Sequence, residues 1–168
     1  MMIRVYANHV LEYAGKRYRC ALGHGGIRPD KHEGDGATPS GRFRLKKLYI
    51  RRDRIRHIET GLPVRDIAAD DGWCDDPLRP EYNRPVKLPF TGSHEKMYRD
   101  DHLYDLVIET NHNDDPPVPG AGSAVFIHVA KPDYAATEGC IALSATDLTA
   151  LLAAWSGHTE IEIFPENG

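Results

Sequence analysis

Short runs in which apolar and polar residues alternate are the commonest pattern along the chain, and this period of two is typical of half-buried β-strands. The turn residues Ala14-Gly15-Lys16 separate two such runs and predict an early hairpin. The strands predicted in this way lie at 3–9, 10–13, 17–22, 43–50, 103–110, 123–129, 141–143 and 160–164.

The clearest helical pattern begins at Ser144. The segment Ser144-Ala145-Thr146-Asp147 has the form of a capping box in which Asp stands in place of Glu. The apolar residues that follow recur every three or four positions and predict one buried helix face; they are Leu148, Leu151, Leu152 and Trp155. We expect Gly157 to end the helix. We interpret the face as part of the core rather than as a binding surface.

The stretch 53–96 lacks strong periodicity and is rich in Pro, Gly and Asp. A long segment of this kind inside a compact domain is more often a functional insertion than a disordered linker. Trp73, Tyr82 and Phe90 indicate that it is folded. We therefore predict a single domain over 1–168, a mainly β, mixed sandwich or barrel with one or two short α-helices.

Composition narrows the classes of function. The 168 residues are 40% hydrophobic and 27% charged with a net charge of −4, which is ordinary for a soluble globular protein. Asp53 interrupts the basic residues of 46–56, so we interpret them as a solvated face rather than a nucleic-acid footprint. No run approaches the ~20 apolar residues of a membrane-spanning helix, and residues 1–6 predict a strand rather than a secretory signal. We expect a monomer with no nucleic-acid partner.

A cysteine and a histidine carry the clearest candidate chemistry. Cys140 ends the segment Thr137-Glu138-Gly139-Cys140 and follows His128 by twelve residues. An ordinary thiol is only a few per cent ionised at neutral pH, so a nucleophilic cysteine needs a neighbouring base or dipole. Pairing of the strand 123–129 with 141–143 would bring His128 to the thiol. Gly139 would let backbone amides approach a substrate carbonyl, as an oxyanion hole requires.

A structural role is the alternative for this pair. A free cysteine often packs as a small hydrophobic residue, and a histidine on a strand is often a satisfied core or surface residue. The other cysteines separate the cases, because Cys20 lies in a strand-like run and Cys74 in a polar stretch, without the glycine and the nearby histidine strand that accompany Cys140. Cys20 and Cys74 could also pair in a disulfide that leaves Cys140 free.

At these positions the chain resembles a known family. His128, Thr137, Gly139 and Cys140 match the signature of the L,D-transpeptidase catalytic domain of YkuD type. The segment 33–43 is similar to the earlier Asp-x-x-Thr-Pro-x-Gly-x-Phe motif of that family, and the resemblance extends over 3–163. The chain departs from the family pattern at Glu138, where the family usually has His, and at Ala142, where it usually has Arg or Asn. These departures suggest a divergent subfamily with its own substrate preference.

The resemblance implies a fold, an activity and a location. The expected enzyme is a cysteine L,D-transpeptidase that acts on peptidoglycan stem peptides, with Cys140 as nucleophile, His128 as base, and Thr137 and Gly139 shaping the turn. A backbone carbonyl is expected to orient the His128 ring, and no metal or organic cofactor is needed. Peptidoglycan lies outside the cytoplasmic membrane, so the expected location is the periplasm or cell envelope. The candidates for substrate contact are Glu138, Tyr134, His112, Asn113 and Tyr98, together with Tyr104.

Other classes of function fit less well. The same Cys–His site with water as acceptor would make a carboxypeptidase or amidase, and a non-catalytic peptidoglycan-binding module would keep only the fold. Papain-like peptidases place Cys well before His in the chain, and sortases use a longer gap. A zinc hydrolase would need the ligands His94, Glu95, His102, His112 and Asp114, whose spacings match no common zinc motif.

Overall fold

A nine-stranded sheet forms the main part of the structure, which is a computed structural model describing residues 1–168. The strand order is β13-β12-β11-β6-β14-β1-β2-β3, and β7 pairs with β6. The strands are β1 (Met2–Tyr6), β2 (Val10–Tyr13), β3 (Lys16–Arg19), β6 (Gly41–Ile50), β7 (Val64–Asp66), β11 (Leu106–Thr110), β12 (Phe126–Val129), β13 (Ile141–Leu143) and β14 (Glu160–Ile163). The predicted early hairpin is confirmed by the antiparallel pairing of β2 with β3.

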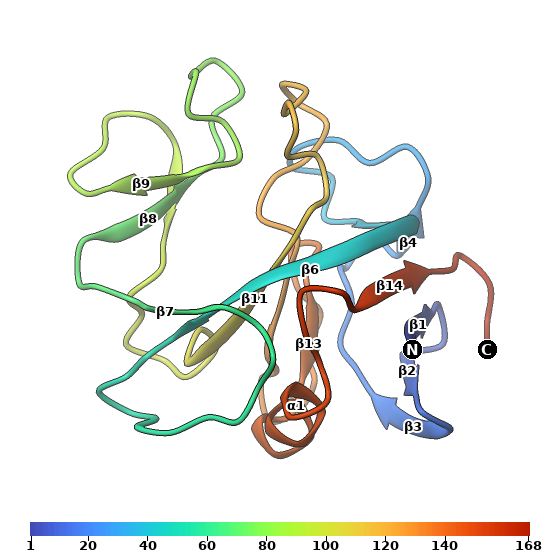
Figure 1. Ribbon diagram of the computed structural model, residues 1–168. Helices are drawn as coiled ribbons and strands as arrows, with labels where there is room; N and C mark the ends of the chain where they lie inside the picture. The colour runs from blue at the N-terminus through green and yellow to red at the C-terminus, as the bar shows by residue number, and fades with distance from the viewer.

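The two ends of this sheet nearly meet. Just after β3, the Ala21 N–H donates to the Ala142 carbonyl at 2.8 Å, and the Ala142 N–H donates to the Ala21 carbonyl at 3.0 Å. The predicted sandwich or barrel is therefore a nearly closed sheet, with the long strand β6 crossing the middle of the molecule (Figure 1). Closure brings the segment after β3 beside the segment that leads into β13.

Alternating side chains of the strands fill the main core. On β1, Ile3 and Val5 are fully buried while Arg4 between them is exposed, as a period of two requires. The helix α1 (Ala145–Leu152) adds Leu148, Leu151 and Leu152 from one face. Burial of a side chain of this size stabilises the fold by roughly 1.5–3 kcal/mol. The helix and the sheet thus share one core, as the sequence pattern predicts.

The start of α1 agrees with the sequence, but its end does not. The Ser144 hydroxyl accepts a hydrogen bond from the Asp147 N–H at 3.1 Å, which confirms the predicted N-cap. The helix stops at Leu152 instead of continuing toward Gly157. The Trp155 carbonyl accepts a hydrogen bond from the Gly61 N–H at 2.9 Å, so this backbone is bonded to a distant loop. Trp155 is still fully buried, although it lies beyond the helix.

The central stretch is folded, as predicted, and it forms a second, smaller sheet that the sequence did not indicate. Its order is β10-β8-β9, formed by β8 (Asp71–Cys74), β9 (Pro85–Lys87) and β10 (His94–Lys96), and it extends from the body of the molecule (Figure 1). Trp73 is buried and packs edge-on against Phe126 of β12, with 5.0 Å between ring centroids. A two-stranded sheet of β4 (Ile27–Arg28) and β5 (Thr38–Pro39) completes the fold.

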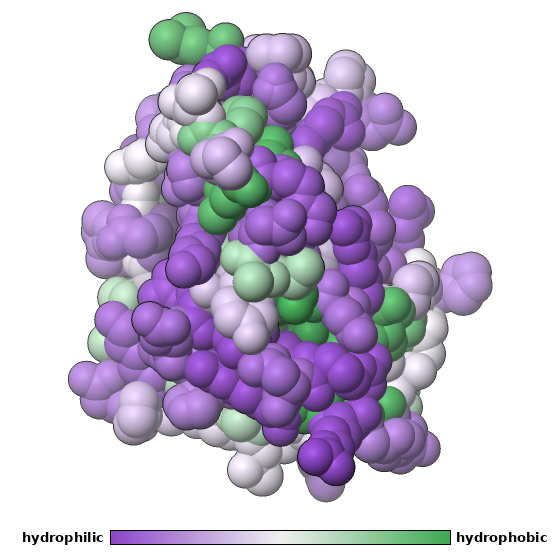
Figure 2. All heavy atoms as spheres, turned by 90° about the vertical axis from the view of Figure 1, so that its left-hand side faces the viewer, coloured by the Kyte–Doolittle hydropathy of each residue, from purple (hydrophilic) through white to green (hydrophobic).

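The surface is largely polar. The face that carries β8 and β9 is mostly hydrophilic, with apolar residues only in small patches (Figure 2). Basic side chains of 46–56 form ion pairs, among them Arg54 with Asp105 at 2.7 Å and Lys46 with Asp114 at 2.8 Å. None of the helices has the length and apolar character that a membrane span requires. Cys20, Cys74 and Cys140 are all free thiols.

Candidate active site

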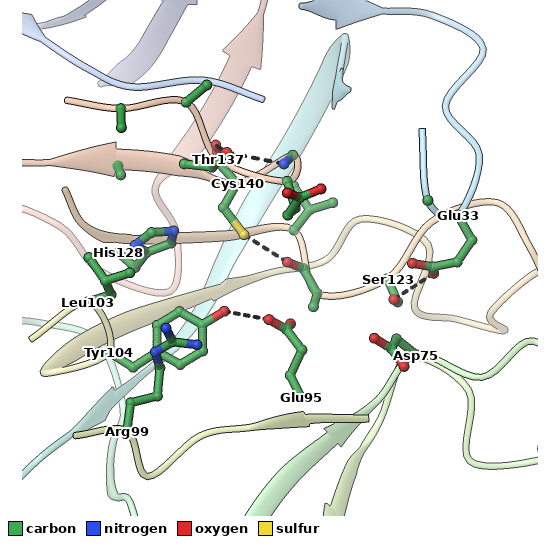
Figure 3. Close-up of a pocket in the computed structure, with 18 of the residues that line it drawn as sticks. Glu33, Asp75, Glu95, Arg99, Leu103, Tyr104, Ser123, His128, Thr137 and Cys140 are labelled. Atoms are coloured by element: carbon green, nitrogen blue, oxygen red, sulfur yellow. Dashed lines mark hydrogen bonds between the residues drawn. The ribbon is translucent and has the colours of Figure 1, made fainter. Parts of the chain in front are cut away.

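A cavity of about 420 Å³ lies where the nine-stranded sheet (the long sheet), the three-stranded sheet β10-β8-β9 (the small sheet) and the segment 31–34 come together. His128 of β12 and Cys140, just before β13, line one side of it. Glu95 of β10 and Asp75, just after β8, lie on the other side (Figure 3). The closed end of the long sheet and the folded insertion therefore both contribute to the same hollow.

Cys140 sits with its sulfur inside this hollow. The thiol donates a hydrogen bond to the Ala124 carbonyl at 3.0 Å (Figure 3), and the Phe126 N–H donates to the sulfur at 3.4 Å. Both partners belong to the segment that enters β12. A backbone donor directed at sulfur favours the thiolate, whereas a carbonyl acceptor favours the protonated thiol.

His128 reaches the cavity from the neighbouring strand. β12 and β13 pair in parallel, with His128 opposite Ala142, which confirms the predicted approach of the two strands. Its Nδ1 lies 2.9 Å from the Val129 carbonyl oxygen and therefore donates a proton to it. Nε2 is left with the lone pair that a general base needs. The Tyr104 ring packs edge-on against the imidazole, with 5.3 Å between centroids.

Burial holds the Cys140 thiol and the His128 imidazole in their neutral forms. It raises the pKa of the Cys140 thiol to about 12, and the Glu95 carboxyl adds to this effect. Burial also lowers the pKa of His128 to about 4, although the bond to the Val129 carbonyl favours the protonated ring. At neutral pH the site therefore contains a thiol and an unprotonated imidazole, the pair from which general-base activation starts.

Two hydrogen bonds of the Thr137 hydroxyl hold the turn before Cys140 in shape. The Thr137 hydroxyl donates to the Cys140 carbonyl at 2.6 Å and accepts from the Gly139 N–H at 3.1 Å. Gly139 has a φ of +142°, and a Cβ on it would stand 2.7 Å from the Ala37 carbonyl oxygen. Only glycine fits this position, because a side chain would meet backbone at less than a van der Waals distance. The Cys140 N–H makes no hydrogen bond within the protein.

The similarity to known proteins covers nearly the whole chain, including this turn and its histidine. Residues 2–163 match the family model described as YkuD, the L,D-transpeptidase catalytic domain. The chain belongs to this family. The expectation drawn from the residues around His128 and Cys140 is thereby confirmed at the level of the family.

Solved structures of low sequence identity also match this chain. Bdellovibrio bacteriovorus Bd1075 is 16% identical with a TM-score of 0.49, the alignment covering 99% of this chain and 48% of that one. The helical cell shape determining protein Pgp2 from Campylobacter jejuni is 12% identical with a TM-score of 0.48, covering 99% and 48%. Mycobacterium tuberculosis L,D-transpeptidase 1 is 13% identical with a TM-score of 0.43, covering 96% and 57%.

The chain thus spans only about half the length of the solved structures that it resembles. A search of curated proteins gave no match.

The predicted substrate-contact residues of the domain divide into two groups. Glu138 and Tyr104 line the cavity. Glu138 stands at its rim, with a side chain 91% exposed and 3.1 Å from His24 Nε2. The other four do not line it. Tyr98 stacks on Arg51 at 3.6 Å, Tyr134 lies under Arg19 at 4.3 Å, and His112 and Asn113 belong to the loop after β11.

Several charged residues of the cavity are not evident from the sequence. Glu95 accepts a hydrogen bond from the Tyr104 hydroxyl at 2.9 Å (Figure 3). Glu33 accepts from the Tyr82 and Ser123 hydroxyls, each at 2.6 Å. The group also includes Lys31, Asp75, Arg99 and Lys131.

The sequence named Glu95 only as a possible zinc ligand, and no three His, Cys, Asp or Glu side chains gather in the structure as a metal site would require. Lys31 and Glu33 stand beside the Asp35 motif, which was the one available signal.

Proposed function

We propose that the domain is a cysteine L,D-transpeptidase that joins peptidoglycan stem peptides through a thioester on Cys140. The observation that carries this proposal is that His128 lies on β12, that Cys140 directly precedes the paired strand β13, and that both line the same cavity. Membership of the L,D-transpeptidase family supports the substrate class. The site of action would be the periplasm or cell envelope, where peptidoglycan lies.

The first half of the reaction forms the thioester. His128 Nε2 takes the proton of the Cys140 thiol, and the sulfur attacks the carbonyl of the diaminopimelate residue in the donor stem. The Cys140 N–H, which has no partner within the protein, is available to the oxyanion that develops there. The tetrahedral intermediate collapses with cleavage of the C–N bond, and the imidazolium gives its proton to the departing terminal D-amino acid.

The second half returns the free enzyme. An amine of a second stem loses a proton to His128 and attacks the thioester carbonyl, and the sulfur leaves as a thiolate that the imidazolium reprotonates. The product is a cross-link, and water as acceptor would give carboxypeptidation instead. The acceptor approaches past Glu138 at the rim, so we infer that this carboxylate attracts protonated amines. All of these groups belong to one chain, and we propose that a monomer is active.

Product analysis tests the proposal directly. Purified protein is incubated with muropeptides, and the products are identified by mass spectrometry. Cross-linked dimers are expected from the parent, no products from Cys140→Ala, and parental products from Cys74→Ala, which removes a buried thiol outside the cavity. A carbapenem is expected to acylate Cys140. Products that persist in Cys140→Ala would refute the assignment, whereas shortened monomers without dimers would identify a carboxypeptidase.

The role of the base needs a separate measurement. His128→Ala is expected to keep the fold and to slow alkylation of Cys140 at neutral pH. An alkylation pH profile identical to that of the parent would remove His128 from the mechanism.

A further inference from the structure

Two effects in this cavity oppose formation of the Cys140 thiolate. Burial raises the pKa of the thiol, and the Glu95 carboxyl places a negative charge near the sulfur. His128 is neutral before the proton moves, so the pair itself holds no positive charge at that point. A fixed cation near Cys140 would favour the state in which the S–H bond is broken and the proton rests on His128 Nε2.

Lys31 is a cation that packs against the turn before Cys140. Its side chain is only 8% exposed and lines the cavity. It runs between two glycines: a Cβ on Gly122 would stand 2.9 Å from Lys31 Cγ, and a Cβ on Gly139 would stand 3.3 Å from Nζ. The ammonium therefore lies against the residue that precedes Cys140. Burial and then Glu95 raise the pKa of the Cys140 thiol, whereas the Phe126 N–H and, after it, Lys31 lower this pKa.

Asp35 holds this ammonium in place. Asp35 Oδ1 lies 2.7 Å from Lys31 Nζ and also accepts the Ala37 N–H at 2.9 Å. Oδ2 accepts the His32 N–H at 2.8 Å. Despite its partial burial, these partners lower the pKa of Asp35 to about 2, so it is charged throughout the working range. The two backbone donors offset part of the carboxylate charge, which leaves the ammonium as the dominant charge toward the turn.

The other cations of the cavity are placed differently. Arg99 is ion-paired with Asp101 at 2.6 Å, and its guanidinium lies 5.2 Å from the centre of the Tyr104 ring. Lys131 is exposed, where water screens its charge. Only Lys31 combines burial, a fixed position and contact with the turn of the nucleophile.

We propose that Lys31 supplies the fixed positive charge that stabilises the Cys140 thiolate, and that Asp35 positions this charge. The inference deepens the proposed function, because it concerns activation of the same nucleophile. Lys31 is a positioning residue in this scheme, since it acts on the sulfur through space and not by contact with the reacting atoms. The segment 31–38 then has a chemical role as well as a structural one, because it delivers a cation while it closes the cavity.

Alkylation of Cys140 by iodoacetamide tests the inference without any peptide substrate. The reagent is uncharged, so its rate reports the thiolate fraction and not attraction of the reagent. The rate at Cys140 is followed from pH 5 to 10 by peptide mass spectrometry. Lys31→Met is expected to slow alkylation at least tenfold at a fixed pH below the thiol pKa, and Lys31→Arg to return it to within threefold of the parent.

Two further variants separate charge from structure. Lys46→Met removes another ion-paired lysine, outside the catalytic cavity, and is expected to leave the profile unchanged. Asp35→Asn removes the counter-charge and keeps one side-chain oxygen as an acceptor, so it is expected to speed alkylation, the opposite direction from Lys31→Met. Thermal unfolding of every variant shows whether it is folded.

The alkylation rates of the Lys31 and Asp35 variants support or overturn the role of Lys31. A parental profile in folded Lys31→Met, or equal slowing in Lys31→Met and Lys31→Arg, would overturn the inference. If Lys31→Met does not fold, slower alkylation in Asp35→Asn would overturn it and faster alkylation would support it. Failure of the proposed function looks different, because the alkylation shifts would still occur while the parent gave no products from muropeptides.

Discussion

The Thr38 hydroxyl donates a hydrogen bond to the Gly139 carbonyl at 2.9 Å and accepts one from the Gly23 N–H at 3.0 Å. Thr38 belongs to the Asp-x-x-Thr-Pro segment, and Gly139 is the residue before Cys140. One buried hydroxyl therefore joins three parts of the chain that are distant in sequence. The two motifs recognised in the sequence are parts of a single structure around Cys140.

Loss of this hydroxyl should destabilise the fold. Thr38→Val keeps the shape of the side chain but leaves the Gly23 N–H and the Gly139 carbonyl without their buried partner, at a cost of about 2 kcal/mol. Thr38→Ser, which keeps the hydroxyl, is the control and should lie closer to the parent. Urea unfolding measures both. A free energy of unfolding for Thr38→Val within about 0.5 kcal/mol of the parent would contradict this account.

Gly139, the residue before Cys140, should tolerate no side chain. Gly139→Ala forces a Cβ to within 2.7 Å of the Ala37 carbonyl at a φ of +142°, so the turn must shift. A shift of about 1 Å in a reacting group costs on the order of a hundredfold in rate, and the expected loss of activity is at least that large. Gly157→Ala is the matched control, because a Cβ there meets nothing within 4 Å. Equal activity in the two variants would rule out the steric explanation.

Stability should depend on the protonation of His112. Burial lowers its pKa from about 6.5 to about 4, so between these values the unfolded chain binds a proton that the native state does not. The contribution is therefore complete above pH 6.5 and is lost as the pH falls toward 4, with a slope of about 1.4 kcal/mol per pH unit for one full proton. His112→Gln should flatten the curve of unfolding free energy in this window. The pKa of His128 is also lowered by burial, so this residue contributes to the pH dependence in the same direction. It remains in the variant, and the slope should therefore decrease without vanishing. Superimposable curves for parent and variant would be the contrary result.

The carboxylate at the cavity rim should act over a distance that salt can screen. Glu138 is 91% exposed, so its attraction for a cationic acceptor operates through solvent. Glu138→Gln is expected to raise KM for a diamine acceptor by about twofold to threefold at low salt, with kcat unchanged, and the difference should disappear in 0.5 M NaCl. A defect that persists at high salt would indicate direct contact with the acceptor instead.

The elements that the sequence predicts well are those with local causes. Alternation identifies β12 and β13, and the spacing of His128 and Cys140 then implies their approach. The helix start follows from Ser144, whose cap is formed by nearby backbone. The helix end does not, because the contact between Gly61 and Trp155 depends on a loop far away in the chain.

The charged lining of the cavity was not predicted, because it too depends on contacts between segments that are distant in the chain. Glu95 and Asp75 come from an insertion without periodicity, and only the pairing of β8 with β10 turns that insertion toward Cys140. Tyr98 and Tyr134 are attractive candidates by residue type, but each ring is occupied by an arginine. The sequence did not predict that Lys31 lies near the turn of Cys140. Its position depends on Gly122 and Gly139, which leave room for its side chain.

The reciprocal hydrogen bonds of Ala21 and Ala142 also bear on how the protein acquires its reactivity. They link an early and a late part of the chain, and contacts of such long sequence separation form late and slowly because loop-closure entropy must be overcome first. Until they form, the strand that follows Cys140 lacks the backbone partner that Ala21 provides. A partly folded chain would thus carry an exposed thiol, and we expect the burial of Cys140 beside His128 to be complete only when the sheet closes.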